Sequence, residues 1–250
     1  MNNPEELPHI ESKEEEPKPS ATVFMVRHGE TEYDEEFSDP NVEEDLTDTG
    51  KEQIQEFAEE VNNEIDDGEK VYIMKSQRTR AKTSADIITE TLEEKGHEAT
   101  TLGGGRPSLN NVKMLDKGGA DIYKKKGEGE QYLADMEDVY ERLQQESDYY
   151  IKSRKGAVEN PVTQNMDEYR GKVKTFVRRI IEIARQRDGD NDKLVLATHG
   201  EFLDSILEQY LSKSIETTED SASKGEFIKM EILSDKLKFY FRGQEVEVNA

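Results

Sequence analysis

Two of the four histidines in the chain come directly after short apolar runs. Residues 27–31 read Arg-His-Gly-Glu-Thr and follow the run 22–26, and a second His-Gly pair follows the run 194–198. Apolar runs of this length and type predict buried β-strands. An imidazole just past the end of such a strand, with a glycine after it, indicates chemistry rather than packing. His28 and His199 are therefore the first candidates for a functional site.

Two arginines are expected to join these histidines. Arg27 precedes His28 directly, and Arg80 lies about one turn into a helix that we predict to open at Ser76, after another strand. In an open α/β sheet, ligands collect at the carboxyl ends of the strands, where helix N-termini also offer backbone donors. We therefore expect the side chains of Arg27, His28, Arg80 and His199 to converge on one anion.

Phosphoryl transfer is the chemistry that fits these groups best. Arginine binds phosphate oxygens in a bidentate manner, and a neutral imidazole can attack phosphorus near pH 7. Neighbouring cations favour the neutral imidazole. Gly29 would let the backbone approach a phosphate without a Cβ in the way, and Thr31 either bonds the phosphate or caps the turn. The chain has no cysteine, which excludes disulfides, thiolate metal sites and cysteine nucleophiles.

Strand-like and helix-like segments alternate along the chain, which is typical of an α/β fold. We predict strands at 22–27, 71–74 and 193–198, a hairpin of 227–233 and 237–241, and helices at about 49–64, from Ser76 onward, at 130–153, 164–187 and 201–211. The helix at 164–187 is expected to bury one face, which carries Val173, Phe176, Val177, Ile180, Ile181 and Ile183. The predicted fold class is a three-layer α/β/α sandwich, with a mostly parallel central sheet and helices on both faces.

Length and composition suit one α/β domain with an insertion. The chain has 250 residues, of which 32% are hydrophobic and 36% charged. Residues 1–20 are acidic and rich in proline, and we predict a disordered arm there, followed by one domain at 21–250. The Gly- and Lys-rich stretch 103–130 has weak periodicity and predicts the start of a variable excursion, or cap, at about 103–165.

Charge and hydropathy exclude several classes of partner. The formal net charge of -23 disfavours nucleic acid and anionic membranes as partners, because both select clustered Lys and Arg. No segment has the apolar length of a secretory signal or a membrane span. We therefore expect a soluble, cytoplasmic protein. The sequence leaves its oligomeric state open.

Four segments of the chain resemble the histidine phosphatase superfamily, the phosphoglycerate-mutase-like enzymes. Arg-His-Gly-Glu-Thr stands at 27–31, and the Leu-Thr-x-x-Gly-x-x-Gln pattern stands at 46–53. Residues 76–85 are similar to the family's Ser-Pro-Leu-x-Arg-Ala-x-Gln-Thr-Ala helix start, and 194–200 to its strand with the second histidine. The segments occur in the family's order, and the set is far more specific than an isolated Arg-His-Gly.

The resemblance implies a role for each candidate residue. His28 would be the phosphorylated nucleophile, Arg27 and Arg80 would clamp the phosphoryl group, and His199 would hydrogen-bond it and stabilise the transition state. Arg80, rather than Arg78, aligns with the family's phosphate-binding arginine. Substrate contacts are expected at Gly29, Thr31 and Gly200. The family pattern requires neither a metal nor a cofactor.

Two positions depart from the family pattern. Many members carry an asparagine six residues after the nucleophile, where this chain has Asp34. Members acting on ordinary phosphate esters also place a general-acid glutamate in a Leu-x-Glu segment, and the nearest match here ends in Asn111. Asp116 is the closest acidic substitute, with Glu128 and Glu130 further along. A phosphohistidine substrate needs less help from an acid, so this position bears on the substrate.

The leading hypothesis is a metal-independent phosphatase of the histidine acid type that acts through phospho-His28. Its substrate would be a small phosphate monoester, a phosphohistidine or another phosphoprotein. Phosphoglycerate mutase-type transfer is the second hypothesis, and it requires a pocket that keeps water from the phosphoenzyme. The third is a weakly active member that binds phosphorylated ligands, with the acidic arm as an interaction tail. The remaining histidines, His9 and His97, are expected to be solvated bystanders.

Overall fold

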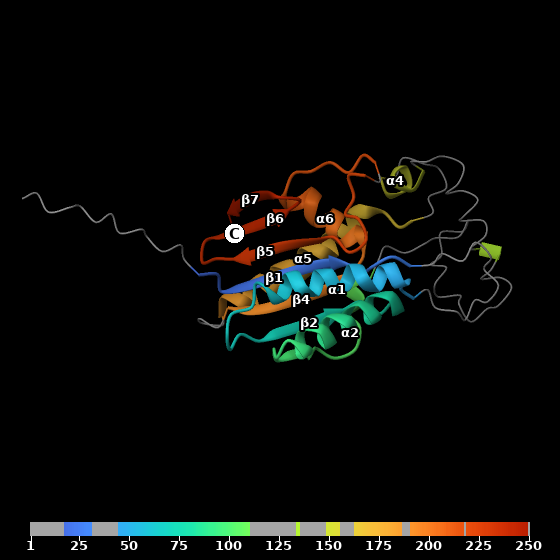
Figure 1. Cartoon of the computed structure of the whole chain (residues 1–250). Helices are drawn as coiled ribbons and strands as arrows, with labels where there is room; N and C mark the ends of the chain where they lie inside the picture. The colour runs from blue at the N-terminus through green and yellow to red at the C-terminus, as the bar shows by residue number, and fades with distance from the viewer. Residues whose placement is uncertain are drawn as a thin grey trace, which may run out of the picture.

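The structure, a computed structural model, describes residues 18–31, 45–110, 134–135, 149–155, 163–186, 191–217 and 219–249. In chain order the elements are β1 (Ala21–Arg27), α1 (Asp48–Asn62), β2 (Val71–Lys75), α2 (Thr79–Glu94), β3 (Ala99–Thr101), a 3-10 turn (Pro107–Leu109), α4 (Tyr149–Arg154), α5 (Met166–Gln186), β4 (Asp192–Thr198), α6 (Gly200–Tyr210), β5 (Phe227–Ile232), β6 (Lys236–Phe241) and β7 (Gln244–Asn249) (Figure 1). Strands and helices alternate up to α6, as the sequence predicts.

The seven strands form one mixed sheet in the order β3-β2-β4-β1-β5-β6-β7. The pairings from β3 to β1 are parallel, and those from β1 to β7 are antiparallel. The predicted parallel sheet therefore forms the core of the domain, and the predicted hairpin of β5 and β6 extends it as an antiparallel half. Because β1 and β4 are parallel neighbours, their carboxyl ends meet at the same edge.

Helices cover both faces of the sheet, which confirms the predicted three-layer α/β fold. Alternate residues of a strand point to opposite faces. Phe24 and Val26 of β1 accordingly join the core under α1 and α2, while Val23 and Met25 join the core with α5 and α6. Figure 1 shows α1 and α2 in front of the sheet and α5 behind it. With both faces of β1 buried, the residue that follows it is held on a rigid support.

Three details differ from the sequence-based expectation. Helix α2 begins at Thr79 with Arg78 as its N-cap, and not at Ser76, because the Ser76 hydroxyl accepts a hydrogen bond from the Arg78 N–H and closes a turn first. Strands β3 and β7 were not predicted, since β3 is three residues long and β7 is mostly exposed. Ile183 does not lie on the buried face of α5: its exposed fraction is 54%.

Several predictions fall on residues that the structure does not describe. Residues 1–17 of the predicted acidic arm lie outside the described ranges, as do Asp34 and Asp116. Of the excursion at 103–165, the structure describes residues 103–110, 134–135, 149–155 and 163–165. Among the described residues, no helix is long and apolar enough to cross a membrane.

Candidate active site

The two His-Gly pairs lie side by side at the carboxyl edge of the sheet. Arg27 pairs with Thr198 in the register of β1 and β4, and the His28 N–H donates to the Thr198 carbonyl at 3.0 Å. The imidazole rings of His28 and His199 are 5.1 Å apart between centroids, with an interplanar angle of 68°. Both residues are buried. The predicted convergence of the two histidines is therefore present in the structure.

The hydrogen bonds of His28 define its tautomer. Its Nδ1 lies 2.8 Å from the Gly29 carbonyl oxygen, which can only accept, so Nδ1 carries the proton. Its Nε2 accepts a hydrogen bond from Nε of Arg80 at 3.0 Å. Burial lowers the pKa of His28 well below its ordinary value, and the charges of Arg80 and Arg27 lower it further, against the Gly29 bond. His28 is therefore a neutral ring whose Nε2 lone pair meets a guanidinium.

His199 is held through the opposite nitrogen. Its Nε2 lies 2.8 Å from the Ser76 hydroxyl oxygen, which also accepts from the Arg78 N–H. A hydroxyl can donate to Nε2 or accept from it, and where Ser76 donates, the ring proton of His199 lies on Nδ1. Within the described part of the chain, this Nδ1 is buried and has no hydrogen-bond partner. Burial, then the charge of Arg80, lowers the pKa of His199 well below its ordinary value.

Arg80, and not Arg78, contacts the nucleophile candidate, as the sequence alignment predicts. Arg80 is the second residue of α2 and is 8% exposed, so its guanidinium is held at the helix N-terminus beside His28. Arg78 is the N-cap, two residues before Arg80, and its charge lowers the pKa of His199. The site thus receives positive charge from both arginines, but only Arg80 bonds an imidazole through a described contact.

Arg27 is the second arginine near the two rings, since its charge lowers the pKa of both histidines. Its Nη1 donates to the Ala222 carbonyl at 2.6 Å, whereas its Nε is buried without a partner among the described residues. Gly200 makes room for this side chain: a Cβ on Gly200 would lie 3.2 Å from Cζ of Arg27. The structure therefore supplies a packing reason for Gly200, and its predicted contact with substrate stays a prediction.

The segment at residues 46–53 packs against the loop after β1 and supports it. A Cβ on Gly29 would lie 2.1 Å from the Gly50 carbonyl oxygen, so the two backbones touch. The Thr47 hydroxyl caps α1 by accepting from the Gly50 N–H at 2.9 Å, and the Gln53 side chain accepts from the Glu30 N–H at 2.9 Å. The Leu-Thr-x-x-Gly-x-x-Gln segment is thus the support that fixes the carbonyl to which His28 is bonded.

Thr31 and Lys224 add a polar rim that sequence reasoning found only in part. Thr31 is buried, bridges to Leu46, and accepts a hydrogen bond from Nζ of Lys224 at 3.2 Å. The Lys224 charge also lowers the pKa of His28. Lys224 lies in the loop before β5, where no periodic pattern marks a residue as functional. Its role emerges only from the fold, because the loop folds back over the end of β1.

Comparison with known proteins agrees with this geometry. Residues 23–102 match the family model described as histidine phosphatase superfamily (branch 1). This part of the chain, less than half of its length, is similar to that superfamily. No curated protein matches the chain by similarity. The match ends before the second histidine, so the assignment of His199 rests on the geometry above.

Solved structures similar to this chain share its fold. A mycobacterial glucosyl-3-phosphoglycerate phosphatase in complex with VO3 has a TM-score of 0.53 at 13% identity, over 89% of this chain and 97% of that chain. Mycobacterial hydrolase 1 has a TM-score of 0.52 at 13% identity, over 92% and 97%. The α-ribazole phosphatase from Shigella flexneri has a TM-score of 0.50 at 14% identity, over 85% and 91%. These likenesses extend the shared fold beyond the residues that the superfamily model matches.

The structure describes only part of the segment 109–111, where the family resemblance places the general acid. Leu109 is buried, and its carbonyl accepts from the Thr198 hydroxyl at 2.7 Å, which ties it to the end of β4. The Asn110 side chain pairs with Gln77, accepting from the Gln77 N–H at 2.8 Å. Asn111 and the acidic candidates that follow lie outside the described residues. Among the described residues, no group of three or more acidic or histidine side chains is placed to hold a metal ion.

Proposed function

We propose that the chain is a phosphatase that forms a covalent phosphohistidine on Nε2 of His28. The observation that carries the proposal is the pair of hydrogen bonds on this ring, from Nδ1 to the Gly29 carbonyl and from Arg80 to Nε2. The first holds the proton away from the reactive nitrogen. The second places a cation where an incoming phosphoryl group would need one.

The first chemical step is attack by Nε2 of His28 on phosphorus. A nitrogen–phosphorus bond forms while the bond from phosphorus to the leaving oxygen or nitrogen breaks, and the leaving group takes a proton. Arg80 exchanges its contact with Nε2 for a phosphoryl oxygen in this step. In the second step, water attacks phosphorus, the nitrogen–phosphorus bond breaks, and orthophosphate leaves with His28 neutral again.

Two buried donors support a phosphoryl group at this place. Nε of Arg27 and Nδ1 of His199 have no hydrogen-bond partner among the described residues. A buried donor without a partner costs roughly 1–3 kcal/mol, so such groups call for a ligand. A phosphoryl oxygen accepts from both kinds of donor. Both would also stabilise charge on the equatorial oxygens of the transition state.

Phosphate monoesters are the proposed substrate class, with phosphohistidine as the variant that needs the least acid catalysis. The names of two similar structures, a glucosyl-3-phosphoglycerate phosphatase and an α-ribazole phosphatase, support a small phosphorylated substrate. A monoester with a poor leaving group requires a proton donor, for which we propose Asp116.

The phosphohistidine mechanism is tested with His28→Ala in the full chain. We expect turnover of p-nitrophenyl phosphate to be abolished, together with the acid-labile phosphate label that the wild type acquires on rapid quenching. His97→Ala is the matched control, because His97 bonds Asn62 on the outside of α1 and touches none of the site residues. Full activity and labelling in His28→Ala would rule the mechanism out.

The proposed acid is tested separately with Asp116→Asn. The variant should keep its rate on aryl phosphates, whose leaving groups need no proton, and lose about 100-fold on alkyl phosphates. Asp138→Asn serves as the control from the same part of the chain. Equal losses on both substrate types, or none, would show that Asp116 is not the acid.

A further inference from the structure

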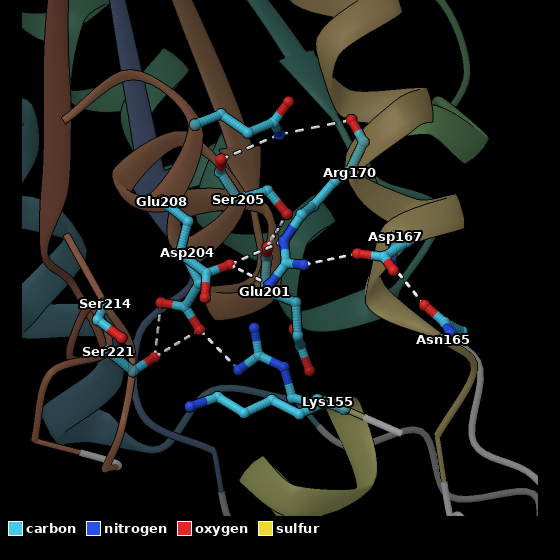
Figure 2. A network of polar contacts seen from close by, with 12 residues as sticks. Lys155, Asn165, Asp167, Arg170, Glu201, Asp204, Ser205, Glu208, Ser214 and Ser221 are labelled. Atoms are coloured by element: carbon cyan, nitrogen blue, oxygen red, sulfur yellow. Dashed lines mark hydrogen bonds and ion pairs between the residues drawn. The ribbon is translucent and has the colours of Figure 1, made fainter. Parts of the chain in front are cut away.

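Two of the carboxylates on helix α6, those of Asp204 and Glu208, lie one turn apart, each in its own network (Figure 2). Glu208 accepts two hydrogen bonds from Arg170 of α5, at 2.9 and 2.6 Å. Asp204 is fully buried and accepts from Nη1 of Arg154 at 2.7 Å. Arg154 itself is 5% exposed. Both carboxylates pair with an arginine, but among the described contacts only the network of Asp204 continues to Arg27 in the candidate active site.

Asp204 reaches Arg27 through the backbone of one residue, Ala222. Its carboxylate accepts from the Ser221 hydroxyl at 2.8 and 2.9 Å and from the Ala222 N–H at 3.3 Å. The Ala222 carbonyl then accepts from Nη1 of Arg27 at 2.6 Å. Figure 2 shows Asp204 pointing from α6 toward Ser221. Asp204 therefore fixes the carbonyl that orients the Arg27 guanidinium.

The orientation of the guanidinium matters because two nitrogens of Arg27 differ in their hydrogen bonds. Nη1 donates to the Ala222 carbonyl, while Nε is buried and has no partner among the described residues. If residues 221–222 moved, Nη1 would lose its acceptor and the planar guanidinium would turn, taking Nε with it.

Arg154 makes the buried carboxylate tolerable. A buried carboxylate without a counter-charge is strongly unfavourable, and here the counter-charge comes from α4, in the part of the chain that the sequence marks as a variable excursion. The end of α4 is held by a second buried pair, Ser153 with Thr163, whose hydroxyl oxygens are 3.1 Å apart. The ion pair between Arg154 and Asp204 thus connects α4 to the residues that orient Arg27.

We propose that Asp204 is a positioning residue: it holds residues 221–222 so that Arg27 presents Nε to the phosphoryl group, and Arg154 is the counter-ion that this requires. The inference rests on the proposed function, since it assigns Arg27 to the phosphoryl group. It adds that the excursion helix α4 takes part in the geometry of the clamp. The effect of Asp204 on the ligand must then pass through Arg27.

The experiment is a double-mutant cycle of Asp204→Asn with Arg27→Ala, read by kcat/KM on p-nitrophenyl phosphate and by the Kd of orthovanadate. We expect Asp204→Asn to weaken both about 30-fold. In the Arg27→Ala background it should change either by less than about threefold, because the group it positions is gone. Glu208→Gln is the matched control on the same helix and should leave kcat/KM and the vanadate Kd within twofold.

Each alternative outcome is decisive. Additive effects in the cycle, or equal effects of Asp204→Asn and Glu208→Gln, would overturn the proposal by showing a general structural role. If Asp204→Asn does not fold, the cycle is run with Ser221→Ala, for which a smaller non-additive loss of about fivefold is expected. A wild type that binds vanadate without turnover would refute the proposed function and leave the binding cycle as the test of Asp204. A wild type that binds no vanadate would refute both.

Discussion

The two His-Gly pairs at the ends of β1 and β4 are alike in sequence and burial but opposite in what they offer a ligand. With Ser76 as the donor to His199, both rings carry their proton on Nδ1. In His28 that proton is taken by the Gly29 carbonyl and Nε2 meets Arg80, whereas in His199 Nε2 is taken by Ser76 and the Nδ1 proton has no described partner. His28 thus presents a lone pair and His199 presents a donor.

The difference is made by the connection that follows β2 and by the first turn of α2. Ser76 reaches His199 and Arg80 reaches His28, and both belong to the segment that leaves β2. The parallel register of β1 and β4 brings the two rings together, but it places both in the same position after their strands and does not distinguish them. The residues of the neighbouring connection decide which histidine is suited to attack and which to donate.

Exchanging each imidazole for an amide should separate these two roles most strongly. His28→Gln removes the nucleophile, and we expect kcat on p-nitrophenyl phosphate to fall by at least about 10⁴-fold. His199→Gln removes one donor to the transition state and should cost about 10²–10³-fold. Rapid-quench labelling distinguishes them further, because only His199→Gln should still form a phosphoenzyme. Similar losses in both variants, or labelling of His28→Gln, would contradict the assignment.

The two glycines that follow the histidines offer a second contrast. In Gly29→Ala the new Cβ would lie 2.1 Å from the Gly50 carbonyl, so the loop and α1 must separate. We expect a loss of about 2–3 kcal/mol in the free energy of unfolding and about 100-fold in kcat/KM. In Gly200→Ala the Cβ meets the Arg27 guanidinium at 3.2 Å, which can shift.

Gly200→Ala should therefore change stability little and lower kcat/KM about tenfold, through Arg27 alone. Urea unfolding and phosphatase assays on the two variants check both statements. The comparison would be wrong if Gly200→Ala were the less stable variant, or if Gly29→Ala kept full activity.

Much of this site could be predicted because its residues follow strands. The apolar runs before His28 and His199 locate both at one sheet edge, and the segment after β2 points to Arg80. The fold class follows from the alternation of elements in the same way. What such reasoning cannot supply is the hydrogen-bond pattern, because the Ser76 contact joins residues 123 positions apart, and its direction depends on where α2 begins.

Other features escaped prediction for a different physical reason. Lys224 and Ala222 lie in a loop without periodicity, and they reach the site only because β5 pairs with β1 in the antiparallel direction. Asp204 lies on a helix among apolar neighbours, where a sequence pattern gives no sign of a buried ion pair with Arg154. Strand β7 was missed because its side chains alternate between exposed and half-buried, without an apolar face to mark it.

Ser76→Ala tests the connection itself and should have a smaller effect than the changes above. Without the hydroxyl, Nε2 of His199 loses its donor, and the ring can place its proton there and turn a lone pair toward the phosphoryl oxygens. One such hydrogen bond is worth about 0.5–1.5 kcal/mol, which corresponds to a loss of roughly two- to tenfold in kcat. Ser205→Ala is the control, since Ser205 is also buried but bonds only within α6. Equal rates in the two variants would show that the Ser76 hydroxyl does not contribute to the orientation of His199.

The smallest signal, and the most direct one, is the protonation of the rings. Because both histidines have a depressed pKa in the folded chain, ¹⁵N NMR should show neutral rings with Nδ1 protonated at pH 6, below the ordinary value of about 6.5. The unfolded chain takes up protons in that range and the folded chain does not, so the free energy of unfolding should fall as pH decreases below 6.5. Each histidine adds a slope of up to about 1.4 kcal/mol per pH unit, and His28→Gln should remove one such increment. An imidazolium signal from His28 at pH 6 would mean that this ring is not poised to attack, and one from His199 would contradict the depressed pKa of that ring.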